Sequence, residues 1–203
     1  MRTLIAVPCM STIPTRFFTS ALAMRRVGET EFTVTESSLI YDARNTMAAE
    51  AVKEGFDRVL WLDSDMSFDA DLMEKLSARV DEGRDFVSGL YVRRRPPHTP
   101  VIFRSVGATQ GEDGKVRAWA DPVTVIPEDI FEIGAAGFGC VMTTVQLLRD
   151  VREQFGLPFS PALGLGEDLS FCVRAAQLGV KMWCDPAIKA GHIGTKIYTQ
   201  EDG

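Results

Sequence analysis

The sequence lacks several features that mark whole classes of protein. It has four cysteines among 203 residues, with no Cys-x-x-Cys pair, and only two histidines. Its apolar runs are much shorter than the roughly 20 residues needed to cross a bilayer. Its first residues also lack the long apolar stretch of a signal peptide. We therefore expect a cytoplasmic protein with no transmembrane segment and with reduced, buried thiols.

Basic charge is also in short supply. The chain carries 22 Lys and Arg against 28 Asp and Glu, for a net charge of −6. Such a chain has no general attraction for nucleic acid or anionic membranes. The 45% hydrophobic and 25% charged residues match globular averages and exclude a disordered chain, a coiled coil or a collagen-like fibre. A chain of this length can bury a sizeable single core.

The first part of the chain alternates strand and helix patterns. The expected elements are strands at 4–7, 31–35, 59–63 and 86–92, and helices at 15–27, 42–54 and 71–80. The strands are assigned from short apolar or alternating runs, and the helices from helical spacing and flanking glycines. Strands separated by helices of this length indicate right-handed βαβ units and a parallel sheet.

The pattern changes near residue 93, where a basic, proline-rich loop begins. The elements expected beyond it are short strands and turns over 101–133 with a hairpin turn at Glu112-Asp113-Gly114, helices at 144–154 and 167–178, and a strand at 180–184. We predict one α/β domain over 1–203, Rossmann-like, with a mixed, mostly parallel sheet flanked by helices. Residues 1–92 and 93–203 form its two halves.

Two carboxylates follow the apolar strand at 59–63. Asp63 and Asp65 are separated by Ser64, and residues i and i+2 of a strand share a face, so we expect both carboxylates to point to the same place. Two close carboxylates repel unless a cation lies beside them. Hard oxygen ligands suit Mg²⁺ or Mn²⁺, which commonly bridge to phosphates. The alternative is that both are ordinary turn residues.

A second acidic pair, Glu167 and Asp168, opens the predicted helix at 167–178. Helix capping and the helix dipole ordinarily explain acidic residues in a first turn. The same dipole would hold a carboxylate ionised, as a general base requires, and would also lower its proton affinity. The pair is therefore either a capping feature or a candidate for proton abstraction.

Three further segments are candidates for ligand binding. His192 lies in a glycine-flanked loop after the strand at 180–184 and is either a structural residue or a metal ligand. Arg44, near the start of a helix, either reaches a phosphate or pairs with an acidic side chain, and Asn45 is placed to read a base or ribose. The run Arg93-Arg94-Arg95 is either a solvated loop or a site for an anionic donor or acceptor.

The order of the motifs is more specific than any one of them. The chain contains, in order, Ala-Arg-Asn at 43–45, Asp-Ser-Asp-Met at 63–66, Gly-Leu-Tyr-x-Arg-Arg-x-Pro-Pro at 89–97, Gly-Phe-Gly-Cys-Val-Met at 137–142, Gly-Glu-Asp-Leu-Ser-Phe-Cys at 166–172 and Gly-His-Ile-Gly at 191–194. This order resembles the small glycosyltransferase-like proteins of the GT-A fold, related to glycosyltransferase family 2 and common in bacteria and phages. The resemblance covers about residues 3–194.

The resemblance implies a metal-dependent, hexosyltransferase-like enzyme that moves a sugar from a nucleotide-diphosphate sugar to a hydroxyl acceptor. Asp63-Ser64-Asp65 matches the Asp-x-Asp motif, which holds Mn²⁺ or Mg²⁺ and the ribose and diphosphate of the donor. Asp65 is the stronger candidate for direct ligation, and His192 matches the late histidine that completes the metal site. Asp168 matches the general base of inverting members, and Glu167 a residue that binds acceptor hydroxyls.

The resemblance also places the nucleotide and the sugar. The nucleotide is expected beside Pro8, Met10, Ser11, Arg44 and Asn45. The loop Gly137-Phe138-Gly139 is expected to line the sugar and the acceptor. A saccharide is the first expectation for the acceptor, with a protein or a modified nucleic acid as alternatives.

Two other classes are retained as alternatives. A non-catalytic nucleotide-sugar-binding module, or a subunit of a larger assembly with this fold, would bind nucleotide without turnover. A nucleotidyltransferase would show a glycine-rich, basic loop after the first strand, where this chain has Pro8-Cys9-Met10-Ser11-Thr12. The acidic pair argues against the first alternative and this segment against the second.

Overall fold

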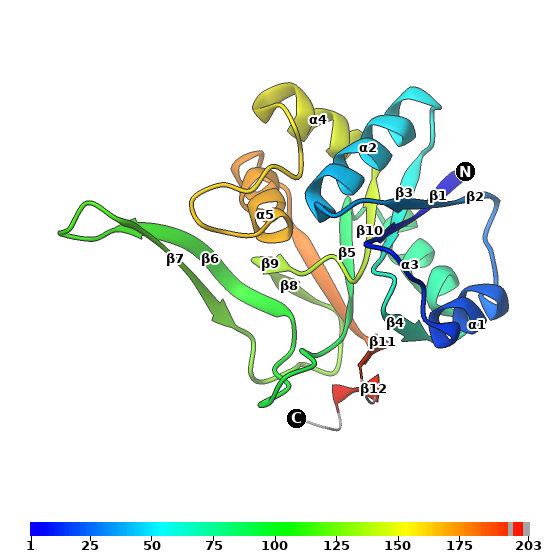
Figure 1. Cartoon of the computed structure of the whole chain (residues 1–203). Helices are drawn as coiled ribbons and strands as arrows, with labels where there is room; N and C mark the ends of the chain where they lie inside the picture. Colours follow the sequence, from blue (N-terminus) through cyan, green and yellow to red (C-terminus); the bar gives the residue numbers. More distant parts are fainter. Residues whose placement is uncertain (195–196, 201–203) are drawn as a thin grey trace.

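A computed structural model of the protein describes residues 1–194 and 197–200 (Figure 1). The helices are α1 (Thr15–Ala23), α2 (Ile40–Lys53), α3 (Leu72–Asp81), α4 (Val145–Phe155) and α5 (Glu167–Gln177). The strands are β1 (Arg2–Cys9), β2 (Glu29–Glu36), β3 (Arg58–Leu62), β4 (Met66–Phe68), β5 (Phe86–Leu90), β6 (Ile102–Gln110), β7 (Val116–Pro122), β8 (Phe131–Ile133), β9 (Ala135–Ala136), β10 (Cys140–Thr144), β11 (Met182–Ile193) and β12 (Ile197–Tyr198). The predicted alternation of strands and helices in the first part is confirmed.

Most strands belong to one sheet with the order β12-β11-β5-β10-β3-β1-β2, and β4 and β8 also pair with β11. β1 runs parallel to β2 and β3, and β11 runs parallel to β5, whereas β10 lies antiparallel between β3 and β5. β3 and β5 therefore run the same way, and the five strands β2, β1, β3, β5 and β11 end at one edge. The predicted mixed, mostly parallel α/β fold is confirmed.

The protein has two hydrophobic cores, one on each face of the sheet, and the side chains of the central strands point alternately into one and the other. In β1, Leu4 and Ala6 face the core that α2, α4 and α5 cover, while Ile5 and Val7 face the core that α1 and α3 cover (Figure 1). Successive side chains of a strand point to opposite faces, so a strand covered on both sides needs a continuous apolar run. This is why the central strands could be recognised in the sequence.

Trp61 of β3 is the largest side chain of the first core. Its ring packs edge-on against Phe138 and Phe159. Its indole N–H donates to Thr143 Oγ1 at 3.0 Å, and neither residue is exposed. Because a buried polar group without a partner is destabilising, this bond allows tryptophan to fill an otherwise apolar space.

Replacing Thr143 with Val is expected to lower the free energy of unfolding by about 1–3 kcal/mol, because the shape is kept and the Trp61 N–H loses its acceptor. Urea denaturation of the single variants and of the double variant with Trp61→Phe measures the coupling between the two residues. Strictly additive losses would show that the hydrogen bond contributes nothing.

The helix that begins at Thr15 is shorter than predicted. It ends at Ala23 instead of Val27, because Met24 takes up an extended backbone conformation. The N–H of Arg25 then donates to the carbonyl of Ala70 at 2.7 Å, outside the helix. A tertiary hydrogen bond thus replaces the last predicted turn.

The hairpin predicted around Glu112-Asp113-Gly114 is confirmed. β6 and β7 pair antiparallel, from Gln110 opposite Val116 beside the turn to Phe103 opposite Pro122. Their hairpin projects from the body of the protein (Figure 1). The N–H of Lys115 donates to Asp113 Oδ1 at 3.2 Å within the turn.

Two predictions from the sequence concern the state of the cysteines and membrane-spanning segments. All four cysteines are buried and free, as predicted. Across the described ranges, no helix combines the length and the hydropathy that a bilayer crossing needs.

Candidate functional site

A cavity of about 320 Å³ lies at the edge where β1, β3 and β5 end. Ligands of open α/β sheets bind at this edge, and the first residues of α2 and α5 also line the cavity. The sequence-predicted residues on its wall are Pro8, Met10, Ser11, Arg44, Asp63, Ser64, Asp65, Phe138, Glu167 and Asp168. The fold thus brings together segments from both halves of the chain.

Asp63 and Asp65 reach the cavity from a turn. β3 ends one residue before Asp63, and the N–H of Met66 donates to the Asp63 carbonyl at 3.1 Å as β4 begins. The argument from strand alternation is therefore wrong, although both side chains line the cavity. Each carboxylate forms an ion pair with a different arginine. Arg44 Nη2 lies 2.6 Å from Asp63 Oδ1, and Arg94 Nη1 lies 3.1 Å from Asp65 Oδ2.

His192 lies on β11, which continues to Ile193 and pairs with β4 through His192 and Met66. The loop predicted around His192 is therefore wrong, since strand pairing includes Gly191 and His192 and continues to Ile193. Its Nδ1 is 3.0 Å from the Val92 carbonyl, and its Nε2 is 3.4 Å from Asp65 Oδ2. A carbonyl only accepts, so Nδ1 carries a proton, and in the neutral ring Nε2 presents a lone pair to Asp65.

The Asp65–His192 pair fits a divalent cation. A carboxylate and a ring lone pair repel at 3.4 Å unless the ring is protonated or a cation lies beside both. A metal-binding histidine usually donates its other N–H to a carbonyl or carboxylate, as His192 does to Val92. Within residues 1–194 and 197–200, no three His, Cys, Asp or Glu side chains gather as a metal centre. Two ligands would come from the chain and others from phosphate oxygens, an arrangement that Mg²⁺ commonly adopts.

The environment of Asp65 favours its ionised form. Burial raises the pKa of this carboxyl, but the hydrogen bond and charge that His192 supplies when its ring is protonated, together with the charge of Arg94, lower the pKa below its ordinary value. An ionised carboxylate is the form that binds a metal.

Arg44 is the buried cation of the site. Its side chain is 2% exposed, its Nη2 donates to Asp63, and its Nε lies 3.5 Å from Glu167 Oε1. Its Nη1 is buried without a hydrogen-bond partner, and the guanidinium carbon is 5.4 Å from the centre of the Phe138 ring. Of the two roles predicted for Arg44, the structure shows the pairing with acidic side chains. Nη1 is left as a donor for a ligand, so contact with a phosphate stays a prediction.

Asp168 has an unusual affinity for its proton. Burial, the largest effect, and the charges of Glu167 and Asp63 raise its pKa from 3.8 to about 6, against the N–H of Leu169 and the charge of Arg44. The expectation that the helix N-terminus lowers its proton affinity is therefore wrong, because desolvation outweighs the dipole and the N–H donor. A carboxyl group that titrates near pH 6 is suited to general base catalysis.

Asn45 does not line the cavity. Its Oδ1 accepts the backbone N–H of Phe159 at 2.9 Å, and the residue is 9% exposed. It therefore connects α2 to the segment between α4 and α5. This position supports a structural role for Asn45. It does not support the prediction that Asn45 binds a base or ribose.

Tyr91 is a site residue that the sequence analysis did not single out. Its hydroxyl accepts the N–H of Gly139 at 3.1 Å. A Cβ on Gly137 would collide with that hydroxyl and would lie 3.4 Å from Asp168 Oδ2. Glycine at 137 thus allows Tyr91 and Asp168 to approach one another. The available signal was the position of Tyr91 at the end of an apolar strand, just before the arginine run.

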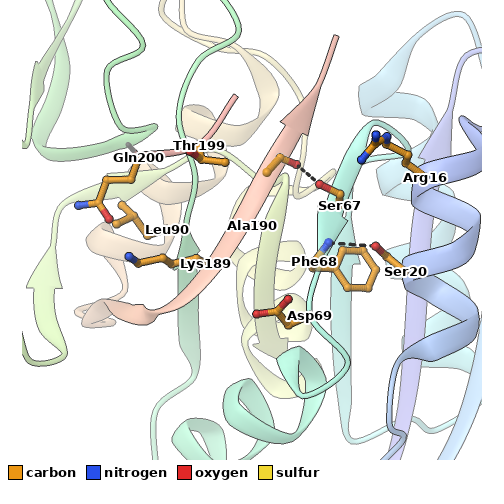
Figure 2. Close-up of a pocket in the computed structure, with 11 residues that line it drawn as sticks. Arg16, Ser20, Ser67, Phe68, Asp69, Leu90, Lys189, Ala190, Thr199 and Gln200 are labelled. Atoms are coloured by element: carbon orange, nitrogen blue, oxygen red, sulfur yellow. Dashed lines mark hydrogen bonds between the residues drawn. The ribbon is translucent and has the colours of Figure 1, made fainter. Parts of the chain in front are cut away.

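Another cavity, of about 360 Å³, lies between α1, β4 and β11 (Figure 2). It contains none of the predicted site residues. Ser67 Oγ donates to the Gly191 carbonyl, and Ser20 Oγ accepts the N–H of Phe68, so both hydroxyls connect elements of the fold. Arg16 and Lys189 lie on opposite sides of this cavity (Figure 2) and do not form a single charged site.

The arrangement of the sheet, the helices and the cavity at the carboxyl edge is that of a GT-A-like fold, the fold of a class of glycosyltransferases. The chain is similar to A197 from STIV, with a TM-score of 0.67 and 19% identity over 98% of this chain and 94% of that chain. It is also similar to GalNAc-T7, solved with UDP, GalNAc and Mn²⁺, with a TM-score of 0.63 and 10% identity.

The likeness to GalNAc-T7 covers 96% of this chain and 44% of that chain, so this protein spans less than half the length of GalNAc-T7. The sequence matches no family model and no curated protein. At these identities the similarity establishes the fold. The relationship to glycosyltransferase family 2 stays a prediction.

Proposed function

We propose that this protein is a metal-dependent glycosyltransferase that moves a sugar from a nucleotide-diphosphate sugar to a hydroxyl acceptor with inversion. One observation carries the proposal: a single cavity is lined both by Asp65, whose carboxylate lies 3.4 Å from His192 Nε2, and by the partly buried carboxyl of Asp168. Sugar transfer needs charge stabilisation at the leaving diphosphate and a base at the attacking hydroxyl. The likeness to GalNAc-T7, solved with UDP, GalNAc and Mn²⁺, supports this donor and metal class.

The donor is assigned mainly to the half formed by residues 1–92. The nucleotide lies against Pro8, Met10 and Ser11 beyond β1, and the ribose and diphosphate lie near Asp63 and Ser64, all on the cavity wall. The unpartnered Nη1 of Arg44 supplies a buried donor to the same ligand.

The metal is assigned to Asp65 and His192. Mn²⁺ or Mg²⁺ held there would stabilise negative charge on the leaving diphosphate. The hydrogen bond from His192 Nδ1 to the Val92 carbonyl holds the ring with Nε2 toward Asp65. Because the ligands would include both oxygen and imidazole nitrogen, Mn²⁺ is a suitable ion for this site as well as Mg²⁺.

The acceptor is assigned to the half formed by residues 93–203. Asp168 takes the proton of the acceptor hydroxyl as its oxygen attacks the anomeric carbon, and the bond from that carbon to the diphosphate breaks with its electron pair on the phosphate oxygen. Glu167 binds acceptor hydroxyls from a position fixed by Arg44, 3.5 Å away. A saccharide is the first candidate, with a protein or a modified nucleic acid as alternatives.

A thermal-shift panel tests the proposal. UDP, GDP, CDP, ADP and TDP are each supplied with Mn²⁺, with Mg²⁺ and with EDTA. A ligand at about 100 times its dissociation constant adds about 2.7 kcal/mol of stability, so one nucleotide should raise the melting temperature in metal and not in EDTA. No shift with any nucleotide contradicts the proposal, and nucleotide binding without donor turnover indicates the non-catalytic module.

Replacing Asp65 with Ala is expected to abolish the metal-dependent part of that shift, because one of two protein ligands is lost. The matched control is Asp69→Ala, which removes the same charge from an exposed residue outside this cavity. It should keep the full shift. Metal-dependent binding that persists in Asp65→Ala would exclude Asp65 as a ligand.

A further inference from the structure

The loop after β5 forms the wall of a third cavity, of about 800 Å³, next to the proposed donor site. Its lining includes Tyr91, Arg93, Arg94, Arg95, Thr99 and His192. No carboxylate of the described chain lines it. In a protein with a net charge of −6, three consecutive arginines around one cavity form a local site of opposite charge.

The backbone of this loop is held by its own hydrogen bonds. The N–H of Arg93 donates to the Thr99 carbonyl at 3.0 Å, and the N–H of His98 donates to the Arg95 carbonyl at 3.0 Å. An antiparallel bridge between Val92 and Pro100 closes the base of the loop. The backbone positions the arginines without using their guanidinium groups.

Those guanidinium groups are available to a ligand to different degrees. Arg93 and Arg95 are exposed, and neither pairs with a carboxylate in the part of the chain that is described. Arg94 is 50% exposed, contacts Asp65 at 3.1 Å and lines both this cavity and the donor cavity. Arg94 therefore connects the two cavities.

The chemistry of this wall specifies the ligand. A guanidinium group presents a planar fork of donors that matches the oxygens of a phosphate and remains charged at any physiological pH. Several such groups, of which only Arg94 contacts a carboxylate in the described chain, favour a ligand group that carries more than one negative charge.

We propose that the arginine cavity, defined by Arg93, Arg94 and Arg95, is a phosphate-binding site beside the donor cavity. The phosphate comes either from the diphosphate of the donor, reached through Arg94, or from a phosphate carried by the acceptor. Its assignment to a donor or an acceptor rests on the proposed function, whereas the binding of phosphate does not.

The first experiment is isothermal titration calorimetry in EDTA with two probes, inorganic pyrophosphate and glycerol 3-phosphate. It compares the natural protein with Arg93→Ala/Arg95→Ala and with the matched control Arg149→Ala/Arg152→Ala. The control removes two exposed arginines of α4, which form no ion pair among the described residues. We expect the affinity for the probes to fall about tenfold or more in the loop variant and to stay unchanged in the control.

The second experiment separates the two sources of phosphate. Glycerol 3-phosphate is titrated into protein saturated with Mn²⁺ and the nucleoside diphosphate that binds in the thermal-shift panel. If the site takes the donor diphosphate, the ester no longer binds and the loop variant also loses nucleotide affinity. If it takes an acceptor phosphate, the ester still binds and the loop variant keeps its nucleotide affinity.

One set of results overturns the proposal. It is wrong if neither probe binds in EDTA, or if the loop variant and the control bind both probes as the natural protein does. Because that titration contains neither metal nor nucleotide, its outcome is independent of whether the protein uses a nucleotide sugar. Failure of the thermal-shift panel alone would contradict the proposed function and leave the phosphate site in place.

Discussion

Replacing Asp168 with Asn is expected to slow sugar transfer by about 10²–10⁴-fold, the usual contribution of a positioned general base, while making the fold more stable at pH 7. The amide oxygen can still accept the N–H of Leu169, which lies 2.7 Å from Asp168 Oδ1. It cannot take the proton of an attacking hydroxyl. Local structure is thus kept while the proposed chemistry is removed.

The gain in stability follows from the direction of the pKa shift. The pKa of Asp168 is raised from 3.8 to about 6 in the folded protein, so between these values the unfolded chain releases a proton that the folded chain retains. The stability from this group is fully present below pH 3.8 and is lost as the pH rises through about 6. Because one pKa unit is worth about 1.4 kcal/mol, the Asn variant should gain about 2–3 kcal/mol at pH 7.

Urea denaturation at pH 7 and at pH 3.5 tests this expectation. The gain should vanish at the lower pH, where Asp168 is protonated in both states. The control Asp129→Asn removes a charge from an exposed residue and should change stability by less than about 0.5 kcal/mol at either pH. An Asn variant that is less stable at pH 7 would show that Asp168 is ionised without penalty.

The activity of the natural protein should also rise with pH through about 6, as Asp168 loses its proton. An Asn variant that keeps more than about a tenth of the transfer rate would be inconsistent with the general-base role. Stability and activity therefore test the two properties of Asp168 separately.

The central strands were predictable because their local pattern reflects their burial. Residues such as Leu4 and Ile5 are both apolar because each face of the sheet is covered. The position of β10 was not predictable. Its place between β3 and β5 depends on the pairing of Cys140 with Leu62 and of Val141 with Ser88, which are contacts between distant parts of the chain.

The candidate site shows the same division. Asp63 and Asp65 are neighbours in the sequence, so their proximity was predictable even though the predicted strand is a turn. The contact of His192 with Asp65 depends on the register between β4 and β11, which no local pattern encodes. For Asp168, the sequence predicts a position at a helix N-terminus but does not predict how far the carboxyl is buried. Burial decides the direction of its pKa shift.

The sequence also does not show which of two adjacent helical residues faces the candidate site. Arg44 and Asn45 stand side by side in the sequence, but successive residues of a helix point about 100° apart. Arg44 therefore reaches the cavity while Asn45 binds the backbone of Phe159. Which of the two faces the site depends on how α2 packs.

Replacing Arg44 with Met is expected to lower the free energy of unfolding by about 3–5 kcal/mol at pH 7, because removing one partner of a buried ion pair leaves the other charges uncompensated. Arg44 contacts Asp63 and Glu167 directly and lowers the pKa of Asp168 by its charge. Without it, the carboxyl groups of Asp63, Glu167 and Asp168 share one cavity with no buried cation among them.

The loss caused by Arg44→Met should be smaller at pH 4 than at pH 7, because Asp168, whose pKa is raised to about 6, is protonated at pH 4 and adds no negative charge to the cavity. Removing Arg44 also raises the pKa of Asp168 above about 6, so any remaining activity should require a higher pH. The comparison that isolates charge is a variant that combines Arg44→Met with Asp63→Asn and Glu167→Gln, measured by urea denaturation at both values of pH. If charge is the cause, this variant recovers most of the lost stability at pH 7. If it is as unstable as Arg44→Met at both values, the stabilisation comes from the packing of Arg44 against Phe138 instead.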